Sequence, residues 1–230
     1  MVEFEYTLIR KSRRKNLSIT ISSDNKIIVK ASKSLPEKII KTFLKNKAGW
    51  IKKKISFNEK FLKPYIAKEF IEGENFLYQG KTYPLVLQKE RGSGIVFKDN
   101  AFFMDVYNNC KDRKRYFTLK FIEWYKIAAY RKLLDRICFY ESILRVSISD
   151  LRIKTLKRTW GSCSTKGVVS FSWKIIMAPL GIIDYLVVHE LCHLIHHDHS
   201  THFWEKVRMV LPDYKKRKKW LAVHENQLNL

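Results

Sequence analysis

Apolar and polar residues alternate along most of the first hundred positions, which is the pattern of half-buried β-strands. The alternating runs are short and are separated by Asn, Asp and Gly, residues that favour turns. One stretch, residues 34–55, instead repeats its apolar residues every three or four positions and places Lys between them, after a candidate Ser34 cap. We therefore expect an antiparallel β region with one basic helix. The predicted strands are residues 6–10, 17–21, 27–31, 76–78, 83–87, 95–97 and 101–106.

The apolar spacing becomes mainly helical from residue 111 onward. Residues 116–140 form one long amphipathic repeat, and residues 182–195 are apolar almost all round, as in a buried helix. Pro179 and Gly181 precede the second segment, as expected near a helix start. Short apolar runs between the two helices predict strands at residues 146–148, 152–156 and 168–176. The chain is therefore expected to be α+β, with an N-terminal β-rich region (residues 1–110) and a second region (residues 111–230) built around the buried helix.

The buried helix carries the sequence His-Glu-Leu-Cys-His, which places His189 and His193 four residues apart. On a helix this spacing puts both imidazoles on one face, one turn apart, where a single zinc ion can bind both. Glu190 lies beside them and can take a proton from a metal-bound water as general base. Two ordinary core histidines are the alternative. However, all seven histidines lie between His189 and His224, which favours a metal site.

A catalytic zinc usually has three protein ligands, so a third must be chosen from His196, His197, His199 and His202. His196 would lie about 4–5 Å further along the same helix, which fits a tetrahedron poorly. His199 follows His193 by six residues, where the helix is expected to end and Ser200 to cap the next one. A ligand on that turn can reach back over the metal, and its spacing matches the His-Glu-x-x-His-x-x-Gly-x-x-His pattern. We therefore expect one zinc ion held by His189, His193 and His199.

Several motifs around this helix resemble those of the bacterial YgjP-like metallopeptidases, relatives of the SprT and Spartan zinc proteases. The resemblance implies a zincin-like metallopeptidase domain with His189, His193 and His199 as ligands and Glu190 as catalyst. It extends to the first part of the chain, through residues 10–31 and 49–51. The matching motifs are residues 160–164 (WGSCS), 172–176 (SWKII), 178–179 (AP), 184–194 (DYLVVHELCHL), 199–200 (HS), 203–204 (FW), 212–214 (PDY) and 220–221 (WL).

Three functions are compatible with these residues. A zinc peptidase would use Glu190 as base and an oxyanion donor such as Tyr214 or Arg158. A nucleotide pyrophosphatase, an activity the resemblance also suggests, would direct the same activated water at a phosphoanhydride. A DNA-associated protein with structural zinc would not need Glu190 as a base, since structural sites are closed by a fourth ligand. We therefore expect a metallopeptidase acting on a protein or peptide.

The composition of the chain predicts a kind of partner, through its charge, and a cellular compartment, through its cysteines. The chain has 45 Lys and Arg against 22 Asp and Glu, a formal charge of +23, which would attract nucleic acid or another polyanion without sequence preference. The basic clusters are residues 11–15, 38–54, 111–115 and 215–219. No apolar run is long enough to span a membrane, and the first residues do not form a signal peptide. Cys110, Cys138, Cys163 and Cys192 show no disulfide pattern, so a reduced, cytoplasmic protein is expected.

Overall fold

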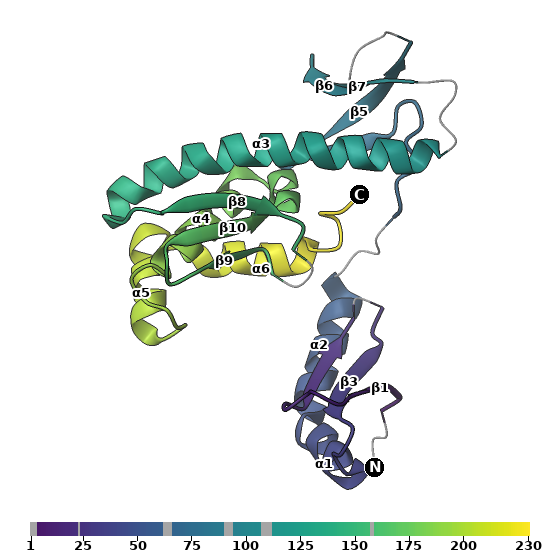
Figure 1. The fold of residues 1–230 in the computed structure, drawn as a ribbon, viewed down its shortest axis with the longest axis vertical. Coiled ribbons are helices and arrows are strands. Elements are labelled where there is room, and N and C mark those ends of the chain that lie inside the picture. The colour runs from purple at the N-terminus through teal and green to yellow at the C-terminus, as the bar shows by residue number, and fades with distance from the viewer. Residues whose placement is uncertain (1–3, 23, 62–65, 90–93, 107–111, 157–158) are drawn as a thin grey trace. The chain divides into compact units, whose positions relative to one another are not determined.

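The computed structural model describes residues 4–22, 24–61, 66–89, 94–106, 112–156 and 159–230. The chain forms two compact units. Unit 1 comprises Met1–Ile66 and Val223–Gln227, and unit 2 comprises Ala67–Ala222 and Leu228–Leu230. The fold is mixed α+β, with three small sheets among the described residues (Figure 1).

Unit 1 contains a three-stranded sheet of order β1-β3-β2, from β1 (Tyr6–Lys11), β2 (Ser18–Ile21) and β3 (Ile27–Ser32). The three predicted strands are present, and they form a mixed sheet where an antiparallel one was expected. β2 is antiparallel to β3, whereas β1 is parallel to it. The central strand alternates as predicted, because Ile27, Val29 and Ala31 are buried.

Two helices cover this sheet where the sequence predicted one: α1 (Glu37–Asn46) and α2 (Ala48–Phe61). The first begins after Pro36, whose fixed extended backbone stands at the N-cap, and not at Ser34. The helices part at Lys47, whose N–H bonds to Phe43 and Leu44 as the first helix ends. Ile40 and Ile51 nevertheless remain on one buried face, which is why helical spacing alone did not reveal the break.

Unit 2 begins with a four-stranded sheet of order β4-β5-β7-β6. Its strands are β4 (Asn75–Tyr78), β5 (Lys81–Gln88), β6 (Ile95–Lys98) and β7 (Ala101–Asp105). β5 and β7 are parallel, and the other two pairs are antiparallel. All four strands were predicted, although the parallel pair was not.

The long helix α3 (Arg113–Leu144) unites the core of unit 2. Its buried residues recur every third or fourth position from Phe117 to Leu144, as the amphipathic pattern predicted. Phe76 of β4 stacks on Phe121 at 4.1 Å, so the first sheet shares its core with this helix. The compact units are consequently divided at Ile66, whereas the sequence placed a boundary at residues 110–111, which lie outside the described residues.

The second sheet of unit 2 has the order β8-β10-β9, from β8 (Asp150–Lys154), β9 (Gly161–Cys163) and β10 (Val168–Ser172). β10 is parallel to β8 and antiparallel to β9. Two predictions fail here, because residues 146–148 form no strand and the run from Val168 ends at Ser172. A 3-10 helix, η1 (Trp173–Met177), takes the remainder.

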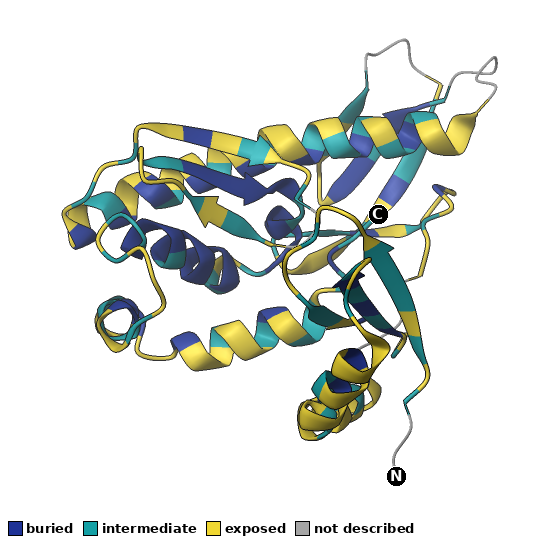
Figure 2. Ribbon diagram, turned by 60° about the horizontal axis from the view of Figure 1, so that its bottom comes forward, coloured by how far each residue is buried: buried dark blue, intermediate teal, exposed yellow. Residues whose placement is uncertain are grey.

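Three helices complete unit 2: α4 (Leu180–Cys192), α5 (Thr201–Val210) and α6 (Tyr214–His224), whose last two residues belong to unit 1. Figure 2 shows α4 almost entirely in the colour of buried residues, as its all-round apolar sequence predicted. Across the described part of the chain, no helix is both long and apolar enough to cross a membrane.

Candidate metal centre

The helix that presents the candidate ligands is fixed on two sides near its N-terminal end. Asp184 of α4 accepts a 2.6 Å hydrogen bond from the Arg136 guanidinium of α3, and both side chains are largely buried. On α6, Arg217 donates to the Gly181 carbonyl at 2.7 Å. These contacts set the position of α4, and therefore the direction in which residues near its C-terminal end point.

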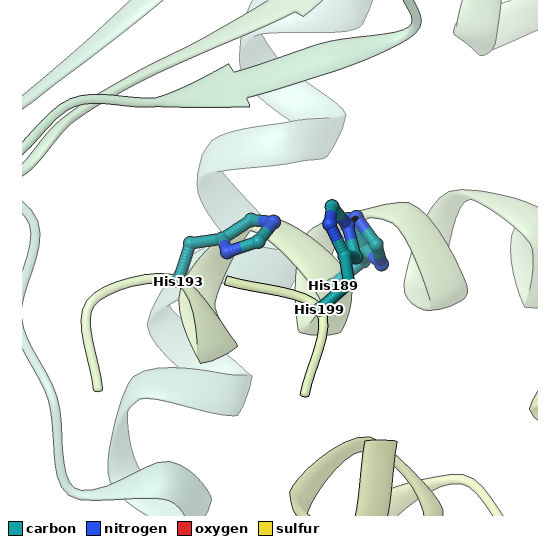
Figure 3. Close-up of side chains that lie close together, drawn as sticks. All are labelled: His189, His193 and His199. Atoms are coloured by element: carbon teal, nitrogen blue, oxygen red, sulfur yellow. Dashed lines mark hydrogen bonds between the residues drawn. The ribbon is translucent and has the colours of Figure 1, made fainter. Parts of the chain in front are cut away.

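Three histidines converge at the C-terminal end of α4 (Figure 3). His189 lies in the last turn of the helix, His193 is its C-cap, and His199 comes from the turn before α5. Each ring offers one nitrogen, and the three nitrogens lie within 4.8 Å of one another. The structure thus brings together the three residues that the sequence selected as zinc ligands.

The spacing of the nitrogens fits a single ion. The Nε2 atoms of His189 and His199 are 3.2 Å apart. Two nitrogens bound at about 2.0–2.1 Å to a tetrahedral zinc would be separated by about 3.3 Å. The short approach of two ring nitrogens is therefore what a shared metal ion would produce.

Neighbouring groups orient the rings. The Nδ1 atom of His193 is 3.0 Å from the carbonyl oxygen of His196, so Nδ1–H can donate and leave the Nε2 lone pair free for a metal. Phe203 stacks on His193 with ring centroids 4.5 Å apart. The ring of Trp204 lies 5.6 Å from those of both His189 and His199. The buried Nδ1 atom of His189 has no hydrogen-bond partner within the described chain.

Burial and neighbouring groups favour the neutral form of His189 and His199, which is the form that binds metals. Burial lowers the pKa of His189 to about 3, with further lowering contributions from the neighbouring His193, His199 and Lys218. The pKa of His199 is also lowered, first by burial and then by His193 and Lys218. Neither histidine therefore needs to lose a proton at neutral pH before it can bind a cation.

Glu190 is buried beside this group, with 4% of its surface exposed. Burial raises the pKa of its carboxyl to about 8 in the metal-free site. No hydrogen bond or ion pair to this carboxylate is found among the described residues. Its side chain packs on Gly161 of β9, where an added Cβ atom would lie 2.5 Å from Oε1. Only glycine leaves room for the carboxylate in this position.

The other histidines considered as ligands lie outside the group. His196 contributes its backbone carbonyl, and its ring stacks on that of His202 at 6.3 Å. His202 itself lies 3.6 Å from Glu205, and His197 is exposed. The helix α4 ends at Cys192, so His196 does not continue the helical face that carries His189 and His193.

Of the two residues predicted as oxyanion donors, the structure describes only Tyr214. Tyr214 is buried and stacks on Trp204 with ring centroids 5.2 Å apart, at the wall of the site. Arg158 lies outside the described residues. Of the cysteines, Cys192 is fully buried in the core and Cys110 is not among the described residues. Cys163 is half-buried, and its pKa is raised first by burial and then by the nearby Glu190 carboxylate.

Sequence reasoning missed three contributors to the site. Gly161 was seen only as part of a motif, and Trp204 only as a matching residue. Lys218 was assigned to a surface cluster, yet its ammonium lies 4.3 Å from the Trp204 ring centroid and acts electrostatically on His189 and His199. The helical spacing could have indicated the position of Lys218, because it follows Tyr214 by four residues and therefore lies on the same face of α6.

Comparison with known proteins gives one family. The family model described as YgjP-like, metallopeptidase domain, matches residues 15–224. Among solved structures, the chain is similar to the metallopeptidase zymogen of Pyrococcus abyssi abylysin, with 25% identity and a TM-score of 0.37. That match covers 39% of this chain and 92% of the other. No curated protein matches the chain.

Proposed function

The chain belongs to the YgjP-like metallopeptidase family, and from this premise we propose that it is a zinc-dependent peptidase. In this proposal His189, His193 and His199 hold the ion, and Glu190 is the general base. The observation that carries it is the convergence of three histidine nitrogens within 4.8 Å, beside a buried glutamate. A site of three histidines also leaves a fourth tetrahedral position open for chemistry.

The chemistry follows from the placement of these groups. When bound, zinc would lower the pKa of a water molecule and polarise the scissile carbonyl. Glu190 removes a proton from the attacking water and delivers it to the leaving amine. A cation close by favours the ionised carboxylate, which offsets the effect of burial on the Glu190 pKa. Glu190 is therefore expected to be ionised when the ion is present.

The geometry also supports a place for an extended substrate. β10, the strand that begins at Val168, lies between β8 and β9, so both its edges are already paired. The edge strand beside the site is β9, and its Gly161 contacts the Glu190 side chain. An extended peptide that pairs with the open edge of β9 would lie next to the proposed base.

A direct assay separates the peptidase from a nucleotide hydrolase. The zinc-reconstituted protein is incubated in parallel with unfolded casein and with UTP, and products are followed by mass spectrometry and phosphate release. We expect new peptide ends and no pyrophosphate. Hydrolysis of UTP alone would show that the metal site serves phosphoanhydride chemistry instead.

A second function, polyanion binding, is favoured by the charge of unit 1. Residues 1–66 and 223–227 contain 17 Lys and Arg against 6 Asp and Glu, nearly half of the net charge of the chain. In α2, Lys52 and Lys53 are exposed beside Trp50, whose surface is 47% exposed. We infer that this unit contacts nucleic acid through phosphate charge, without reading sequence.

A further inference from the structure

A groove of about 550 Å³ lies between strand β6 and helix α3 in unit 2. One wall is the strand, through Ile95, Val96 and Phe97, and the other is the helix, through Ile127 and Arg131 among others. None of the residues that line it belongs to the three-histidine group. The groove is therefore separate from the candidate metal centre.

The strand wall offers unpaired backbone groups. β6 is an edge strand that pairs only with β7 in the described sheet. Asp99 and Asn100 both have positive φ and form a two-residue turn, so the flanking pair Lys98 and Ala101 exchanges hydrogen bonds. Because the pairing alternates along an antiparallel ladder, the N–H and C=O groups of Ile95 and Phe97 point to the open side.

The helix wall combines apolar surface with positive charge. Val96 on the strand and Ile127 on the helix both line the groove and are 54% and 50% exposed, a large exposure for apolar residues. Arg131 has no carboxylate partner within the described part of the chain. The only anion found near Lys132 among the described residues is Asp135, at 3.8 Å and largely exposed.

We propose that this groove binds an extended, acidic peptide segment of another protein, which adds to β6 as a further strand. The free N–H and C=O groups of Ile95 and Phe97 would pair with its main chain. Every second side chain of the segment would face the groove, where apolar ones would meet Ile127 and acidic ones would reach Arg131 and Lys132. A nucleic acid could meet the two cations, but it has no main chain to pair with the strand edge. The groove thus supplies a protein-recognition site separate from the proposed zinc site.

The probe is a fluorescent, end-blocked heptapeptide, Glu-Thr-Val-Thr-Glu-Thr-Val, whose Glu and Val side chains share one face of an extended strand. Fluorescence anisotropy is the readout, and mass spectrometry checks that the peptide stays intact. We expect saturable binding to the full-length protein. Arg131→Glu should raise the Kd about tenfold, because it places a like charge against the probe. Arg208→Glu on α5 is the matched control, since it makes the same charge change at an exposed residue outside the groove, and it should leave the Kd unchanged.

Amide hydrogen exchange tests the main-chain pairing itself. The heptapeptide should slow exchange at Ile95 and Phe97, while Val96 and Lys98, already bonded to β7, should change little. A heptapeptide with N-methylated alternate residues should bind at least about tenfold more weakly, because it lacks the donors. Equal loss of binding in both Arg variants, or slowed exchange elsewhere than β6, would overturn the proposal. Competition by single-stranded DNA, with no protection of β6, would assign the groove to nucleic acid.

Discussion

At the scale of single residues, the third ligand is the most specific claim about the site. His199 reaches His189 with Nε2 atoms 3.2 Å apart, whereas His196 and His202 stack on one another. His199→Ala should therefore lower the zinc retained after dialysis about 10-fold or more, and His196→Ala and His202→Ala should retain it. The measurement is zinc content by mass spectrometry. Similar losses in all three variants would contradict the assignment.

The buried carboxyl of Glu190 makes a prediction about stability and pH. Burial raises its folded-state pKa from 4.5 to about 8, so its contribution is fully present below 4.5 and is lost as the pH rises through 8. In the metal-free protein, Glu190→Gln should gain stability relative to wild type over this range, by about 3 kcal/mol at pH 7.

Urea unfolding with a chelator present measures this difference. The gap between the two proteins should widen from pH 4.5 to 8 and then stay constant. A gap that does not change with pH would mean that Glu190 is not desolvated in the folded protein. Other titrating groups are common to both proteins and cancel.

Gly161 is predicted to position Glu190. A Cβ atom there would lie 2.5 Å from Oε1, so Gly161→Ala must displace the carboxylate. A shift of about 1 Å can lower kcat about 100-fold, and zinc content should not change. Gly49→Ala is the matched control, since a Cβ atom there meets nothing within 4 Å and the helix tolerates alanine. An active Gly161→Ala enzyme would show that the carboxylate has room elsewhere.

At the scale of elements, the long helix and the metal helix were predictable because their apolar spacing was strong. Strand partners were not, because pairing depends on residues far apart in sequence. β1 pairs in parallel with β3, and β10 is central and not at an edge. The histidine positions on α4 followed from local spacing alone. Gly161 contacts Glu190 only because β9 folds beside α4, which no local pattern records.

The position of α4 depends on the ion pair between Arg136 and Asp184, whose side chains are 18% and 12% exposed. Asp184→Ala should lower the free energy of unfolding by about 3 kcal/mol, because it leaves a largely buried guanidinium without its partner. The double variant Arg136→Met, Asp184→Ala should be less destabilised than the sum of the single changes. Additive losses in urea unfolding would mean that the two side chains act independently.

At the scale of the whole molecule, the positive charge is concentrated in unit 1, which carries nearly half of the net charge in fewer than a third of the residues. If this unit contacts phosphates, log Kd for duplex DNA should rise with log salt, by about 0.9 per phosphate contact. Lys52→Glu with Lys53→Glu should reduce the slope more than Lys215→Glu with Lys216→Glu on α6. Absence of DNA binding at about 50 mM salt would contradict the inference that unit 1 contacts nucleic acid.

The central claim is that a zinc ion held by His189, His193 and His199 acts with Glu190 to hydrolyse peptide bonds. Its most direct test compares wild type and Glu190→Gln, both loaded to the same measured zinc content, on unfolded casein. New amino termini are counted by mass spectrometry over time. We predict steady cleavage by wild type and a loss of at least about 100-fold in the variant, with the zinc retained. Equal cleavage by both proteins would contradict the account.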